Sequence, residues 1–96
     1  MVPLEEIVSS LESVLADQAV FLSKLQRTTP GSLTHDEIHE MEQEITPSGE
    51  LLSEAMRSIV KLNPHPEIIG NRLKNAFDNM GEILKLLTVL HRNAPL

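Results

Sequence analysis

Apolar residues recur along the chain in three long stretches, with spacings that alternate between three and four residues. This spacing places side chains on one face of an α-helix, so it predicts helices at about 3–27, 34–62 and 67–92. In the first and third stretches an extra apolar position per heptad widens that face, which is typical of helices that pack in a bundle. The seam positions are Leu4, Ile7, Leu11, Val14, Gln18, Phe21 and Leu25 in the first stretch and Ile69, Leu73, Ala76, Met80, Ile83, Leu87 and Leu90 in the third, with Val8, Leu15, Leu22, Phe77 and Leu84 as the extra positions.

The middle stretch begins with a strong helix-start pattern. Thr34 and Glu37 are spaced as in a capping box, in which each side chain binds the backbone amide of the other residue. Leu33 and Ile38 occupy the two positions of a hydrophobic staple around the same cap. We therefore expect a helix to begin at Thr34.

A helix breaker, Thr46-Pro47-Ser48-Gly49, interrupts this middle stretch. A proline inside a helix removes a hydrogen bond and costs about 3 kcal/mol. The seam nevertheless continues with the same spacing, so we predict one bent helix with a kink at 46–49 and a hinge at Pro47 and Gly49. The alternative is a second helix with Thr46 as its cap and Pro47 in its first position. The seam positions are Ile38, Met41, Ile45, Ser48, Leu52, Ala55, Ile59 and Leu62.

Two short segments with turn composition, at 28–32 and 64–66, separate the three predicted helices. At about 1.5 Å per residue the helices would be roughly 38, 42 and 39 Å long, so their lengths match. Matched helices joined by short turns predict an all-α fold, an up-down-up antiparallel three-helix bundle that forms a single domain over residues 1–96.

Composition excludes several classes of function. The net charge is −6 and no basic patch is present, which argues against binding to nucleic acid. The chain has no cysteine, so it has neither disulfides nor a thiolate metal site. No apolar run approaches the roughly 20 residues of a membrane span, and the start, MVPLEE, is unlike a secretory signal. We therefore expect a soluble cytoplasmic protein.

One end of the predicted bundle combines a thin apolar stripe with many acids. The segment 36–45 has few apolar positions and no Lys or Arg, whereas Leu86 and Val89 lie beside the seam of the last helix. We predict a partner-binding surface here, and we expect 36–45 to be the moving part. The alternative is that Leu86 and Val89 complete the core. The predicted surface consists of Met41, Ile45, Leu86, Val89 and Leu90, with Glu42 and Glu44 on an acidic rim.

His35 and His39 are four residues apart, a spacing that can place two imidazoles on one metal ion. The motif HDEIH differs from HExxH, however, and neither His65 nor His91 is near in sequence, so we expect solvated histidines and no metal site. Asp36 and His39 match one carboxylate-x-x-His element of di-iron bundles, but the other helices lack the inward-facing acids of such sites.

The sequence carries no recognisable catalytic arrangement. No serine has a base at a familiar spacing, and Gly31 and Gly49 are isolated rather than part of a phosphate loop. We therefore expect no enzyme and no cofactor. The leading hypothesis is a protein-interaction module, such as a small helical chaperone, adaptor or regulator, that binds a helical or basic partner. The alternative is a homo-oligomerisation subunit, such as a homodimer, that exchanges helices at 46–49.

Overall fold

A computed structural model describes residues 4–61 and 66–95 of the chain. Within them it has four α-helices and no strand, so the predicted all-α class is confirmed. Residues 3 and 62 of the predicted helices, and Pro64 and His65 of the predicted turn, lie outside the described residues. The helices are α1 (Leu4–Gln26), α2 (His35–Glu42), α3 (Thr46–Val60) and α4 (Glu67–Asn93).

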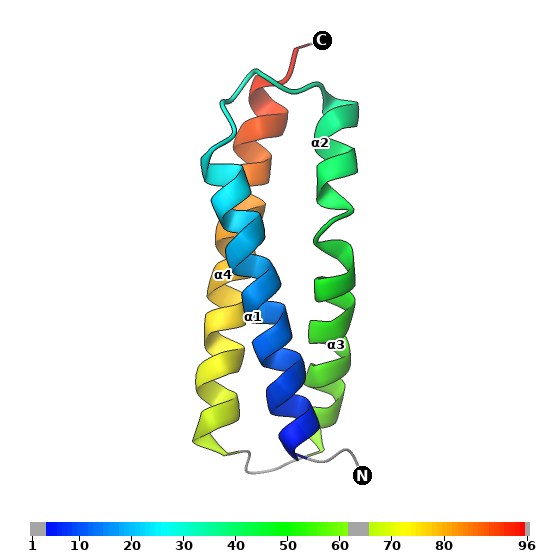
Figure 1. The fold of residues 1–96 in the computed structure, drawn as a ribbon, viewed down its shortest axis with the longest axis vertical. Coiled ribbons are helices and arrows are strands. Elements are labelled where there is room, and N and C mark those ends of the chain that lie inside the picture. The colour runs from blue at the N-terminus through cyan, green and yellow to red at the C-terminus, as the bar shows by residue number, and fades with distance from the viewer. Residues whose placement is uncertain (1–3, 62–65, 96) are drawn as a thin grey trace.

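The four helices form an elongated body of 48 × 18 × 17 Å. α1 and α4 lie side by side and run in the same direction, whereas α2 and α3 follow one another in the opposite direction (Figure 1). α3 packs mainly on α1, and α2 packs on α4. The long middle helix predicted from the seam is therefore two helices placed end to end.

The interruption between α2 and α3 lies at residues 43–45, not at the predicted 46–49. There the amides of Gln43, Glu44 and Ile45 donate to carbonyl oxygens three residues back, at 3.1–3.2 Å, which is the tighter spacing of a 3₁₀ turn. The α-helix resumes with Ile45 as N-cap and with Pro47 in the first turn, where its missing amide costs nothing. Because both cap residues, Gln43 and Ile45, keep right-handed helical dihedrals, the chain continues in the same general direction.

The predicted hinge residues accordingly belong to α3. Pro47 lies in its first turn, and the amide of Gly49 donates to the Ile45 carbonyl oxygen at 3.1 Å in a regular helical bond. The alternative of a separate helix at Thr46-Pro47 describes the structure better, although the cap is one residue earlier than expected. The Thr46 hydroxyl donates to the Glu42 carbonyl oxygen at 3.3 Å instead of capping α3.

The predicted start of the middle stretch is confirmed. The Thr34 hydroxyl accepts from the Glu37 amide at 3.2 Å, and the Thr34 amide donates to the Glu37 carboxylate at 3.1 Å. Both halves of the capping box are therefore present. This cap matters because α2 has only eight residues, a length at which a helix depends on its ends and on tertiary packing.

Among the described residues, the core consists of two apolar clusters, one at each end of the body. We name the clusters by their places in Figure 1. The lower core joins α1, α3 and α4, and the upper core joins α1, α2, the residue before α3, and α4. Two buried polar residues, Gln18 and Ser48, belong to neither cluster. The lower core is Ile7, Leu11, Val14, Leu52, Ala55, Ile59, Ile69 and Ala76, and the upper core is Phe21, Leu25, Ile38, Met41, Ile45, Ile83, Leu87 and Leu90.

Candidate interaction site

The apolar residues of the predicted partner surface are largely inside the protein. Met41, Ile45 and Leu90 are buried in the upper core, and Leu86 is half-buried against the same cluster. Val89 is also half-buried. The thin stripe of α2 is sufficient to cover this end because Ile38 and Met41 both reach the core between α1 and α4. The structure therefore favours the alternative in which these residues complete the core.

The two acids of the predicted rim make contacts within the chain. Glu44 forms an ion pair with Lys24 of α1, at 2.7 Å between Nζ and Oε1. Glu42 is half-buried, and its carboxylate contacts the imidazole of His91 on α4. Both acids therefore connect α2 and the following turn to the neighbouring helices.

His91 is the residue that the sequence did not associate with the α2 histidines. Its Nδ1 lies 3.0 Å from Nδ1 of His35, and its Nε2 lies 2.5 Å from Oε1 of Glu42. Nδ1 of His39 lies 3.5 Å from the other oxygen of Glu42. The fold thus joins residues more than 45 positions apart into one polar contact between α2 and α4. In the described residues, however, no group of three or more such side chains could hold a metal ion.

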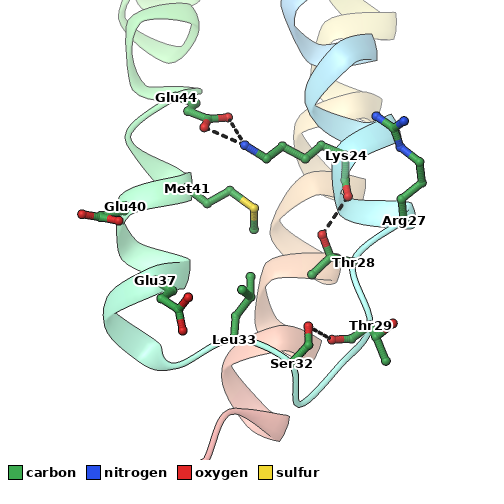
Figure 2. A pocket seen from close by; sticks show the side chains of 10 residues that line it. All are labelled: Lys24, Arg27, Thr28, Thr29, Ser32, Leu33, Glu37, Glu40, Met41 and Glu44. Carbon is green, nitrogen blue, oxygen red and sulfur yellow. Dashed lines mark hydrogen bonds and ion pairs between the residues drawn. The ribbon is translucent and has the colours of Figure 1, made fainter.

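A shallow hollow of about 520 Å³ lies on the other side of α2, between α2, the end of α1 and the loop that joins them. Figure 2 shows Met41 extending from α2 toward α1, with Lys24 reaching Glu44 across the hollow. Its lining contains no histidine or cysteine, and Glu37 is engaged in the α2 cap. The hydroxyls of Thr28 and Ser32 donate to the backbone carbonyl oxygens of Lys24 and Thr29, so neither is hydrogen-bonded to a carboxylate of the lining. The lining residues are Lys24, Arg27, Thr28, Thr29, Ser32, Leu33, Glu37, Glu40, Met41 and Glu44.

An exposed apolar stripe runs along α4. Phe77 and Leu84 are 45% and 58% exposed and lie one heptad apart, so they share a face of the helix. Leu73 and Met80 are half-buried and lie between this face and the core. We call these four residues the α4 stripe. The sequence placed Phe77 and Leu84 at the edge of the buried face, but α3 packs mainly on α1 and leaves them uncovered.

Exposed charges of both signs accompany the α4 stripe. Asp78 directly follows Phe77, and Glu82 lies two residues before Leu84. Lys74 lies one helical turn before Phe77, and Lys85 directly follows Leu84. Glycine occupies position 81, where an added Cβ would meet no other atom within 4 Å, so this part of the surface is open. The sequence contained the signal for this stripe, because 73, 77, 80 and 84 keep the 4-3-4 spacing of a second seam.

In the described part of the chain, no helix is both long and apolar enough to cross a membrane. Comparisons of the chain with protein families, with curated proteins and with solved structures found no match.

Proposed function

We propose that this chain is a non-enzymatic protein-interaction module, of the adaptor or small-chaperone kind, that binds a helical partner through the α4 stripe. The observation that supports this proposal is the exposure of Phe77 and Leu84 at the edge of a helix face that is already buried against the core. Apolar residues one heptad apart, with further apolar residues between them, form the kind of seam onto which a second helix packs.

The partner we propose has acidic flanking residues, which would pair with two exposed lysines beside the α4 stripe and avoid the exposed Asp78 and Glu82. Lys74 and Lys85 are exposed on either side of Phe77 and Leu84 along the helix. Complementary charge increases the rate of encounter and selects the orientation of a docking helix. This differs from the basic partner expected from the sequence, because Glu42 and Glu44 contact His91 and Lys24 within the chain.

In this proposal the four helices work as an up-down-up bundle, with α2 and α3 acting as one interrupted rod. The opposite direction of α2 and α3 relative to α1 and α4 supports this description (Figure 1). The bundle supplies a rigid support for α4, so the α4 stripe binds without a large change in backbone shape. We place this activity in the cytoplasm and expect it to need no cofactor.

The alternative is that a second copy of the chain occupies the α4 stripe and that the protein is a homo-oligomerisation subunit. Light scattering on the purified protein separates the two cases. A monomer supports binding to a different protein. A dimer that becomes a monomer when the α4 stripe is changed supports the alternative.

The partner proposal is tested by the double variant Phe77→Glu/Leu84→Glu, with Val20→Glu as matched control. Val20 is 70% exposed on α1, so the control adds a charge at an apolar surface position away from the α4 stripe. Affinity capture from host extract is expected to recover a protein that the control retains and the double variant loses. A synthetic helix from that protein, with acidic flanking residues, should compete for binding.

Circular dichroism establishes that both variants keep their helices. If the double variant captures the same proteins as the control, the α4 stripe is not the binding surface and the proposal is wrong. A competing segment that is basic or is not helical would instead contradict the proposed kind of partner.

A further inference from the structure

The contact between α2 and α4 contains a hydrogen bond between two histidines. Nδ1 of His35 and Nδ1 of His91 are 3.0 Å apart, and the two rings are stacked with centroids 5.3 Å apart and planes 13° apart. A hydrogen bond between two ring nitrogens requires a proton on one of them and a lone pair on the other. The contact therefore accommodates one proton between the two rings and not two.

The carboxylate of Glu42 determines which nitrogen of the His91 ring carries a proton. Because an ionised carboxylate accepts hydrogen bonds and does not donate them, Nε2 of His91 carries a proton where it faces Oε1 of Glu42. In the neutral ring this leaves Nδ1 of His91 as an acceptor for Nδ1–H of His35. If His91 takes up a second proton, His35 must become the acceptor.

When both rings carry a positive charge, the contact cannot persist. Each Nδ1 then has a proton, so two N–H groups point at one another across 3.0 Å. Glu42 supplies a single negative charge, and it also lies 3.5 Å from Nδ1 of His39. The cations at the end of α1 have partners elsewhere, since Lys24 pairs with Glu44 and Nε of Arg27 donates to the Ser23 carbonyl oxygen.

We propose that His35, His91 and Glu42 form a proton-sensitive latch that holds α2 against α4. In neutral solution the shared hydrogen bond and the contact with Glu42 are both intact. Protonation of both histidines breaks the hydrogen bond between them and loosens α2. Histidine is the side chain whose charge changes in mildly acidic solution, so acidification is the signal to which such a contact responds.

α2 is the part of the fold on which such a latch can act. It has eight residues and is separated from α3 by the 3₁₀ turn at 43–45, so it can open without unwinding α3. Opening of α2 removes Ile38 and Met41 from the upper core and uncovers Leu87 and Leu90 of α4. The latch thus controls access to an apolar surface at this end, which is separate from the α4 stripe and does not depend on it.

Amide hydrogen exchange measured by NMR tests the latch. Exchange rates at pH 7.5 and pH 5.0 are corrected for the intrinsic rate at each pH, and the protection of α2 is divided by the protection of α3 in the same molecule. We expect this ratio to fall at least threefold at pH 5.0. The variants His35→Gln and His91→Gln should each remove the pH dependence, because glutamine has no second proton to gain.

His39→Gln is the comparison variant: it removes the histidine that lies 3.5 Å from Glu42 but leaves both nitrogens of the hydrogen bond between the rings, so it should keep the pH dependence. A ratio that is the same at both pH values in the unaltered protein overturns the latch. It is also overturned if His35→Gln and His91→Gln, folded by circular dichroism, both retain the dependence. Loss of the pH dependence in His39→Gln alone would also overturn the latch, because the dependence would then arise from His39 and not from the pair of His35 and His91.

Discussion

The side-chain amide of Gln18, which is fully buried in α1, donates a 3.0 Å hydrogen bond to the main-chain carbonyl oxygen of Ala76 in α4. The amide oxygen of Gln18 accepts from Asn79 at 3.2 Å, so both ends of the group are satisfied. A buried amide is tolerated when all of its partners are in place, and it then disfavours other alignments of the two helices. We therefore expect this pair to set how far α1 is shifted along α4.

Replacement of Gln18 by alanine should destabilise the protein by about 2–3 kcal/mol, because it leaves a cavity and removes the partner of Asn79. Chemical denaturation followed by circular dichroism measures the change in the free energy of unfolding. Gln26→Ala, at the exposed end of α1, is the control and should change it by less than about 0.5 kcal/mol. Equal effects of the two substitutions would show that the bond to Ala76 contributes nothing.

Ser48 joins α3 to α1 in a similar way. It is buried, and its hydroxyl donates to a carboxylate oxygen of Asp17 at 2.8 Å. Ser48→Ala removes this hydrogen bond and should reduce the free energy of unfolding by about 1–2 kcal/mol. Ser53→Ala, on the exposed face of the same helix, is the comparison and should be close to neutral or slightly stabilising, since alanine has the higher helix propensity.

The 3₁₀ turn between α2 and α3 should depend on Pro47. Alanine at this position restores a backbone amide and removes the ring that excludes the carbonyl oxygen of Gln43. We expect Pro47→Ala to convert residues 43–45 to α-helix, with NMR secondary chemical shifts as the measurement. Gly49→Ala is the control and should leave the turn in place, because an added Cβ at Gly49 meets no atom within 4 Å. A turn that persists without the proline would have its cause in the tertiary packing.

Leu86 should matter for stability more than Val89. Both are half-buried, but Leu86 packs against the upper core. Leu86→Glu places a charge against that cluster and should cost about 2 kcal/mol or more, whereas Val89→Glu should cost less. Thermal unfolding of the two single variants measures the difference. If both are neutral, these residues are surface positions, as the partner-binding hypothesis first supposed.

Hydrogen exchange at neutral pH should show residues 36–42 opening faster than residues 52–60. α2 is short and packs on α4, whereas α3 is nearly twice as long and packs mainly on α1. Local opening is easiest where few apolar contacts are lost. Equal protection of the two segments would mean that the 3₁₀ turn has no dynamic consequence.

The sequence by itself determined which residues form helices and which of their faces are buried. Removing apolar side chains from water lowers the free energy of the folded chain, whichever helix covers them. Ile7, Ile38 and Ile83 could therefore be assigned to the core from the helical period, without knowledge of their neighbours. The cap at Thr34 was equally predictable, because both of its partners lie within three residues. The sequence also predicted the approximate position of the interruption between α2 and α3, near Pro47.

Tertiary structure decided which edges of each apolar face are covered by a neighbouring helix. Phe77 and Leu86 both lie at the edge of the apolar face of α4, yet Phe77 is exposed and Leu86 packs against the upper core, because neighbouring helices cover only one of these edges. Likewise, nothing in the sequence was a reason to pair His35 with His91, and they are in contact only because α2 lies beside α4. Local periodicity reports that a side chain avoids water, but the helix that covers it is chosen by packing between distant segments.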